Sequence, residues 1–199
     1  MMRAMKTQSI AKSLAISMAL SLLALTAVAS GSEYTADGQL KMPTNYREWV
    51  FLSSGIDMSY SASAPMDHHM FDNVFVNPEA YKSFLQTGTW PEGTTLVTEV
   101  RAGTGKGSLA KRGTFQTTEI MGLEVHVKDS QRFSGSWAFF GFDDQPTAKM
   151  IPQTEQCYSC HAAHAAVDTT FVQFYPTLID IAVAKGTLSA NYRREKQIQ

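Results

Sequence analysis

The sequence predicts an α+β fold, in which a mainly antiparallel β-sheet is flanked by helices and a helix near the C-terminus contains a Cys-x-x-Cys-His motif. Strand-like alternation of apolar and polar residues is concentrated in the middle of the chain, between residues 94 and 142. Helix start and stop signals precede and follow this segment. The chain has 199 residues, of which 44% are hydrophobic, so it is long and apolar enough to bury the core of one domain.

Residues 1–29 are predicted to be a signal peptide. A basic start is followed by an apolar run over residues 13–29, which ends in a small-x-small cleavage pattern at Ala27-Val28-Ala29. An uncleaved transmembrane anchor is the alternative, although this run is at the short limit for spanning a bilayer. Cleavage leaves one domain, residues 30–199, in the periplasm, and the loss of three basic residues changes the formal net charge from −1 to −4. This acidic balance argues against nucleic acid as a partner.

The first elements of the predicted domain are a short helix, a long loop, a strand and a second helix. Asn45 is a candidate N-cap, and apolar residues within 46–50 fall on one helical face. Residues 53–70 are rich in Ser, Ala and Asp, which is typical of a long and often functional loop. Residues 73–76 form an apolar strand, and Asn77-Pro78 then begins a helix that stops at Gly88.

Four strands are predicted in the middle of the chain, over residues 94–102, 113–120, 123–129 and 136–142. In the first of them, Leu96, Thr98 and Val100 share one face. The glycine-rich segment 103–113 joins two strands and lacks the ending of a phosphate-binding loop, so it is expected to be a flexible hairpin loop. The last strand is apolar on both faces, which indicates a central, fully buried strand.

Helices are predicted again after a proline-containing link. One begins at about Glu155, and the last element runs from Pro176 to about Lys185, where Gly186 stops it. Residues 191–199 are expected to be a disordered, solvated tail.

Cys157, Cys160 and His161 form the one strong chemical signal of the sequence. Cys-x-x-Cys-His is the attachment motif of a c-type haem, because the two thiols lie on one helical face and the next residue is an iron ligand. A thioredoxin-like pair, a zinc site that also uses His164, and a plain disulfide are the alternatives. The first belongs early in a βαβ unit, the second lacks another Cys-x-x-Cys, and the third leaves the histidine unexplained. The sequence therefore predicts one covalently attached haem c with His161 as its metal ligand.

The second axial position of the iron decides between functions. No methionine follows His161, so a sixth ligand would have to come from upstream. The upstream candidates are Met42, Met58, Met66, Met70, Met121, Met150, His68, His69 and His126. His126 lies on the polar face of its strand and is expected to be a surface histidine. An open or weakly occupied position is favoured, and such iron binds small molecules such as nitric oxide.

Several blocks of the sequence resemble the cytochrome P-460 family, which includes hydroxylamine-oxidising haem proteins and the nitric-oxide-binding cytochromes c′-beta. The blocks are residues 45–51, 73–94, 121–133, 135–142 and 157–178. The resemblance implies a mainly antiparallel sheet flanked by helices, a homodimer, His161 as the proximal ligand and an open distal side.

Two departures from the family pattern concern the distal side. Hydroxylamine-oxidising members cross-link a lysine to the haem edge, and the matching position here is Thr98, which has no amine. Relatives often have an arginine before the 73–76 strand, where this chain has Asp72. Met66 stands where relatives often have phenylalanine, and Phe71 is the alternative distal aromatic residue. Phe140 is a further candidate for the distal pocket.

Three functions are compatible with these observations. The first is a periplasmic mono-haem cytochrome that binds or detoxifies nitric oxide and related small nitrogen species at an open distal site. The second is a hydroxylamine-oxidising enzyme, and the missing lysine argues against it. The third is a simple electron carrier that exchanges electrons with a redox partner such as another cytochrome. Glu99, Asp67 and Asp72 are the carboxylates expected nearest the distal side.

Overall fold

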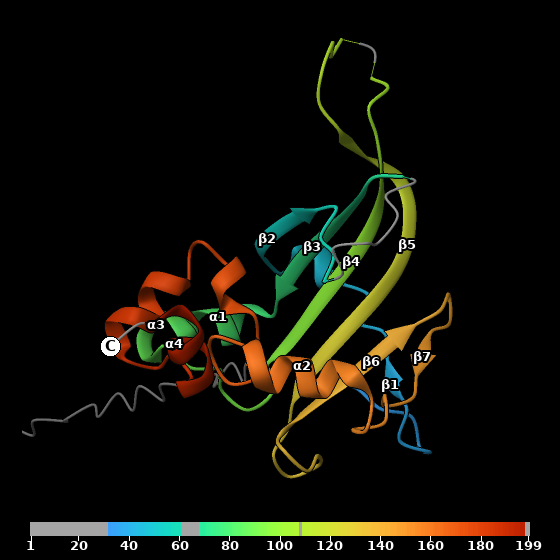
Figure 1. Cartoon of the computed structure of the whole chain (residues 1–199). Helices are drawn as coiled ribbons and strands as arrows, with labels where there is room; N and C mark the ends of the chain where they lie inside the picture. The colour runs from blue at the N-terminus through green and yellow to red at the C-terminus, as the bar shows by residue number, and fades with distance from the viewer. Residues whose placement is uncertain (1–31, 61–67, 108, 198–199) are drawn as a thin grey trace, which may run out of the picture.

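The computed structural model describes residues 32–60, 68–107 and 109–197, so the predicted signal peptide, Met66 and Asp67 lie outside the described residues. A five-stranded sheet, in the order β2-β3-β4-β5-β6, forms the centre of the described structure (Figure 1). Its strands are β2 (Val50–Ile56), β3 (Met70–Val76), β4 (Thr95–Thr104), β5 (Phe115–Lys128) and β6 (Trp137–Phe142). Every neighbouring pair is antiparallel, which confirms the predicted α+β architecture.

Helices flank this sheet. Helices α1 (Pro78–Thr87), α3 (Ile179–Lys185) and α4 (Ala190–Lys196) gather at one end, and α2 (Gln156–His164) runs between this group and β6 (Figure 1). The remaining elements are the 3₁₀ helices η1 (Tyr46–Glu48) and η2 (Val172–Phe174) and a small antiparallel sheet of β1 (Leu40–Lys41) and β7 (Thr147–Ala148). None of the helices within the described residues has the length and hydropathy needed to cross a membrane.

Helix α1 begins and ends as its sequence predicts. Pro78 occupies the start of the helix, where its missing N–H costs nothing, and Gly88 ends it with a left-handed φ of 74°. A Cβ at Gly88 would lie 2.7 Å from the Cβ of Lys185, so a glycine also allows the close approach of α3. Asn77 accepts a hydrogen bond from the backbone N–H of Thr95 at 2.8 Å, which fixes the start of α1 to β4.

The two faces of the sheet support two separate apolar clusters. The cluster on the helix side includes Leu52, Val76, Phe84, Trp90, Leu96, Trp137 and Leu178. The cluster on the opposite face includes Leu40, Tyr46, Val97, Val125, Phe133, Phe140 and Phe142. Because side chains alternate along a strand, each of the long strands β4 and β5 places residues on both sides.

Three strand predictions were wrong. The segments 113–120 and 123–129 were expected to be two strands, but they form the single strand β5. Residues 53–56 were expected in a loop, but they belong to β2, where the Ser54 hydroxyl donates to the Asn73 side chain at 2.8 Å and the backbone pairs with β3. The strand is stabilised by pairing with β3, which is distant in sequence. The Ser and Gly composition of residues 53–56 therefore gives no local sign of it. β6 was expected at the centre of the sheet, but it is an edge strand, and it is apolar on both faces because each face joins a different cluster.

The predicted disordered tail was also wrong over most of its length. Residues 190–196 form α4, and Tyr192 is only 8% exposed. Ser189 caps this helix, since its hydroxyl accepts a hydrogen bond from the N–H of Tyr192 at 3.1 Å. The charged residues of this segment lie on the exposed side of an amphipathic helix, which explains why its composition suggested disorder.

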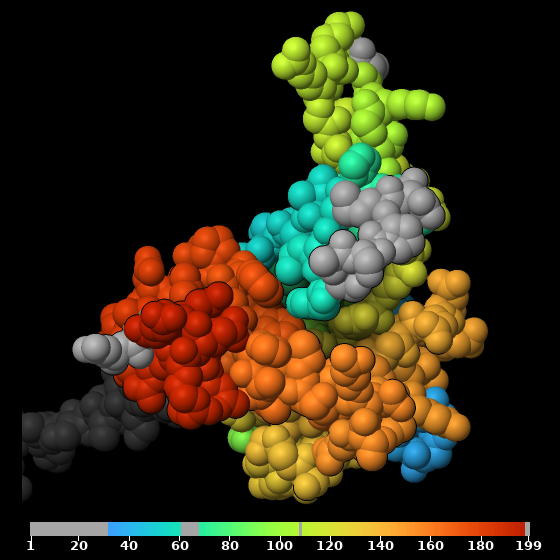
Figure 2. Space-filling model, in the orientation of Figure 1, coloured from blue at the N-terminus to red at the C-terminus, as the bar shows by residue number. Residues whose placement is uncertain are grey.

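Strands β4 and β5 extend past the rest of the sheet into an arm whose described residues are 104–107 and 109–115. Figure 2 shows this arm standing clear of the body of the protein. Its described basic residues, Lys106, Lys111 and Arg112, are exposed, as a hairpin loop predicts.

Candidate functional site

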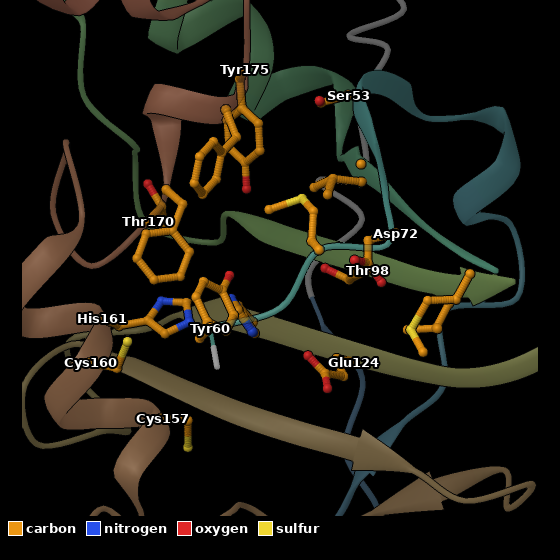
Figure 3. Close-up of a pocket in the computed structure, with 18 of the residues that line it drawn as sticks. Ser53, Tyr60, Asp72, Thr98, Glu124, Cys157, Cys160, His161, Thr170 and Tyr175 are labelled. Atoms are coloured by element: carbon orange, nitrogen blue, oxygen red, sulfur yellow. The ribbon is translucent and has the colours of Figure 1, made fainter. Parts of the chain in front are cut away.

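Helix α2 presents the three residues of the Cys-x-x-Cys-His motif. Cys157 and Cys160 lie three residues apart, which places them on one helical face. Both thiols are free, and with His161 they line a cavity of about 580 Å³ between α2 and the sheet. Figure 3 shows the two sulfur atoms and the imidazole ring along one side of this cavity. Burial raises the pKa of the Cys157 thiol above its usual value.

One hydrogen bond fixes the orientation and tautomer of His161. Its Nδ1 lies 2.7 Å from the backbone carbonyl oxygen of Thr169, and a carbonyl only accepts, so Nδ1 holds the proton. The lone pair is therefore on Nε2, the nitrogen available to a metal. Burial lowers the pKa of His161, which favours the neutral ring.

Aromatic rings enclose the imidazole. The ring centroid of His161 is 4.2 Å from that of Phe171, 4.7 Å from that of Phe139 and 5.0 Å from that of His126. His126 lines the cavity beside His161, so the expectation of a surface histidine was wrong. Burial, followed by the proximity of His161, lowers the pKa of His126 to about 3 and keeps it neutral.

The sheet side of the cavity combines small and acidic side chains. Thr98, Asp72 and Glu124 come from β4, β3 and β5, and Figure 3 shows them across the cavity from the motif. Partial removal from water, followed by repulsion from Asp72, raises the pKa of Glu124. Partial removal from water, followed by repulsion from Asp57, raises the pKa of Asp72. Each of these carboxyls therefore keeps its proton to a higher pH than an exposed one.

Only some of the predicted distal residues line the cavity. Thr98 lines the cavity together with its neighbour in the pattern, Val100. Phe71 does not line it, because Met70, Asp72 and Val74 take the cavity face of β3 and Phe71 points to the other face. Phe140 was also misplaced, since it is 1% exposed within the cluster on the opposite face.

The same alternation corrects the prediction for Glu99. This residue is 2% exposed on the face opposite the cavity, where it accepts hydrogen bonds from Tyr46, Arg47 and Arg101. Asp72 is therefore the one predicted distal carboxylate that the described structure places in the cavity.

The structure also narrows the candidates for a sixth iron ligand. Of the described methionines and histidines that precede the motif, Met58, Met70 and His126 line the cavity. Met42 packs on the opposite face, and Met121 and Met150 are each 41% exposed without lining it. Nδ1 of His69 forms a hydrogen bond with the Asp57 carboxylate at 2.7 Å.

Several cavity residues were missed by sequence reasoning. Glu124, Tyr60, Phe171 and Tyr175 all line the cavity. Glu124 shares its strand face with His126, so recognising one as inward would have found the other. Tyr60 and Phe171 come from irregular segments, where no periodicity exists to show which way a side chain points; their rings are 6.1 Å apart.

The sequence matches one family model over most of the domain. The family model described as Cytochrome P460 matches residues 43–172, about two thirds of the chain. The chain belongs to the cytochrome P460 family. Cytochromes P460 bind haem c covalently, so haem c is the cofactor of this protein. Proteins of the family are typically exported. No curated protein matches the chain.

The residues around the cavity fit the cofactor of a cytochrome P460. Two free thiols on one helical face are the groups that thioether attachment requires, and an imidazole with its lone pair on Nε2 is the form that binds iron. The cavity volume lies within the range of cofactor sites, and its walls are largely apolar, as such sites are.

Proposed function

We propose that this protein is a periplasmic mono-haem c-type cytochrome whose open distal site binds or detoxifies nitric oxide and related small nitrogen species. The observation that supports this most strongly is the asymmetry of the cavity. Cys157, Cys160 and His161 lie on the α2 side, and the small or acidic side chains of Thr98 and Glu124 lie on the sheet side. The haem c iron supplies a coordination position at which a diatomic ligand binds.

In this proposal each motif residue has one role. The sulfur atoms of Cys157 and Cys160 attach the cofactor, and Nε2 of His161 is the proximal ligand. The Thr169 carbonyl keeps the proton on Nδ1 and so maintains Nε2 as a donor. Phe171 and Phe139, which pack against the imidazole, exclude water from its surroundings.

The composition of the cavity wall favours ligand binding over hydroxylamine oxidation. None of the described residues that line the cavity is a lysine, and Thr98 occupies the position expected for the cross-linking amine. Lys106 and Lys111 belong to the exposed arm, which stands clear of the body (Figure 2). Among the described residues, therefore, no lysine lines the cavity that could replace the missing cross-link for hydroxylamine oxidation.

Thr98 and Glu124 provide the polar groups on the sheet side. They are opposite each other in the β4–β5 register, with Asp72 on the neighbouring strand β3. The Thr98 hydroxyl donates a hydrogen bond at any pH, whereas each carboxyl donates only while protonated. The raised pKa of Glu124 widens the pH range over which it donates.

Optical spectra of the purified ferrous holoprotein test the proposal. Addition of carbon monoxide or nitric oxide is expected to shift the haem bands at once, because no protein ligand has to leave. A Thr98→Val variant removes the hydroxyl without changing the side-chain volume, and we expect faster ligand loss from it, by about fivefold for one neutral hydrogen bond of about 1 kcal/mol. A ferrous spectrum that does not respond to either gas would reject the open site.

Mass spectrometry of the haem peptide tests the hydroxylamine-oxidising alternative. The expected species contains residues 157–161 and the porphyrin with no further chain. A third peptide that contains a lysine, together with oxidation of added hydroxylamine, would establish that alternative.

Met58 and Met70 support electron transfer as a second candidate function. Both thioethers line the cavity, and a methionine axial ligand is typical of electron-transfer cytochromes. If either one is the sixth ligand, Met58→Leu or Met70→Leu will convert a spectrum insensitive to carbon monoxide into a sensitive one. If the wild type is already sensitive and neither variant differs from it, electron transfer through a methionine-ligated haem is excluded.

The proposed location follows from the exported character of the family and from the basic and apolar start of the chain. Subcellular fractionation should recover the protein in the periplasm, with its first residue at about Ser30. Recovery with the membrane, with the initial methionine intact, would indicate an uncleaved anchor.

A further inference from the structure

A turn at residues 167–170 delivers the carbonyl that holds His161. Val167 and Thr170 form an antiparallel bridge, and the N–H of Thr170 donates to the Val167 oxygen at 2.9 Å. Asp168, within the turn, has a left-handed φ of 52°. Thr169 follows it, and its oxygen accepts from Nδ1 of His161. Since α2 and this turn are separate elements, the hydrogen bond depends on what fixes the turn.

Trp90 fixes the turn from the side of the helix cluster. Its indole Nε1 donates to the Thr170 hydroxyl at 2.7 Å, and that hydroxyl donates in turn to the Val167 oxygen at 2.8 Å. Trp90 is 2% exposed and Thr170 is 1% exposed. The ring centroids of Trp90 and Phe84 are 4.3 Å apart. A buried hydroxyl that both accepts and donates is held in one orientation.

Lys128 fixes the same turn from the sheet. Its ammonium group donates to the Trp90 carbonyl at 2.8 Å and to the Asp168 carboxylate at 3.0 Å. The side chains of Lys128 and Asp168 are 16% and 30% exposed. One cation at the end of β5 therefore joins the segment that contains Trp90 to the segment that contains the turn.

From this geometry we infer that Trp90, Thr170, Lys128 and Asp168 are positioning residues that tune the axial imidazole. They act through the Thr169 carbonyl, whose hydrogen bond makes the imidazole a more strongly donating ligand. A stronger donor stabilises ferric iron relative to ferrous iron, and hydrogen bonds to the side chain that ligates the iron are one of the means by which proteins set a haem potential. The inference rests on His161 being the proximal ligand, as proposed above.

The test compares variants that remove single hydrogen bonds from this network. Thr170→Val removes the hydroxyl and keeps the shape of the side chain, and Trp90→Phe removes the indole N–H. In each we expect the ferric–ferrous equilibrium to move toward the ferrous state by about tenfold, matching the lower end of the loss in metal affinity when a ligand's hydrogen-bond partner is removed. A tenfold change is about 59 mV for a one-electron couple. The iron–imidazole stretching frequency in the resonance Raman spectrum of the ferrous protein should fall at the same time.

Two matched variants separate tuning from general destabilisation. Thr170→Ser keeps the hydroxyl and should restore both the potential and the stretching frequency. Thr147→Val removes the hydroxyl hydrogen bond to Gln39 at 3.1 Å, on the small β1–β7 sheet, and should change neither quantity. If Trp90→Phe does not fold, Thr170→Val provides the test alone.

The outcomes are distinguishable from a failure of the proposed function. Unchanged potential and frequency in a haem-loaded Thr170→Val variant would overturn the positioning role and leave haem attachment intact. A wild-type protein without a thioether-bound haem, or with another proximal ligand, would instead overturn the proposed function.

Discussion

Thr98 and Glu99 are adjacent residues of β4 that serve opposite faces of the sheet. Thr98 lines the cavity, whereas Glu99 is buried among Tyr46, Arg47 and Arg101. Burial alone would raise the pKa of Glu99, but hydrogen bonds from Arg101 and Tyr46 outweigh it and lower the pKa. The charged Glu99 therefore has a structural role on the face of the sheet opposite the cavity.

Replacing Glu99 with glutamine should destabilise the protein by about 3 kcal/mol, because Arg101 would keep a buried charge without its partner. A carboxylate whose pKa is lowered by folding stabilises the fold at any pH above its pKa in the unfolded chain. This contribution is lost as the pH falls below about 4. The difference between wild type and variant, measured by urea unfolding, should therefore shrink on acidification. Glu33→Gln, in the exposed pair with Lys41 at 3.4 Å, is the control and should have little effect. An equal loss in both variants would contradict this account.

Asp72 should behave in the opposite way. Its raised pKa means that the folded protein binds the proton more tightly than the unfolded chain, so its charge opposes folding above that pKa. We expect Asp72→Asn to be more stable than wild type at neutral and alkaline pH, with the gain disappearing below about pH 4, where aspartic acid is protonated in both states. Thermal unfolding over a pH series measures this. A gain that persists in acid would indicate a packing effect instead.

The predicted elements differ in how well local pattern describes them. α1 was predicted at both ends because Pro78 and Gly88 act locally, and the C-terminal stop at Gly186 is equally local, with a φ of 69°. β2 and the inward orientation of His126 were missed because pairing and cavity formation involve distant segments. The motif could be recognised because covalent chemistry fixes its spacing. No such constraint acts on the distal residues, so Thr98 and Asp72 line the cavity as predicted whereas Phe71 and Phe140 do not.

Helix α4 supports α2, which contains the motif. The Asn191 amide donates to the Ala162 carbonyl at 2.9 Å, and the Ser189 hydroxyl donates to the Ala165 carbonyl at 2.7 Å. A chain ending at Ser189 loses the buried Tyr192 side chain and the Asn191 bond, and should be less stable by about 3 kcal/mol. Denaturant unfolding of the holoprotein measures this loss. A chain ending at Lys196 retains α4 and should match the wild type; an equal loss in the two truncations would show that α4 does not support α2.

At the scale of the whole molecule, the sheet has one face covered by helices and one that is partly bare. The bare region, here called the outer patch, consists of Phe51, Ile56, Phe71, Phe75 and Ile120. Phe51 is 52% exposed, Ile56 48% and Ile120 41%, although all are large apolar residues. Large apolar side chains that remain exposed on one face of a sheet are typical of an interface.

We expect the outer patch to join two copies of this chain, which agrees with the homodimer that the family resemblance implies. A standard interface buries about 800 Å² on each partner, which requires the flanking surface as well as these five residues. The double variant Phe51→Ser, Ile56→Ser should therefore sediment as a monomer in analytical ultracentrifugation, with its haem spectrum unchanged because the cavity lies on the other face. The control is Leu85→Ser, Val183→Ser, which changes exposed apolar residues of α1 and α3 and should leave the dimer intact. A wild type that sediments as a monomer at all concentrations would reject the interface.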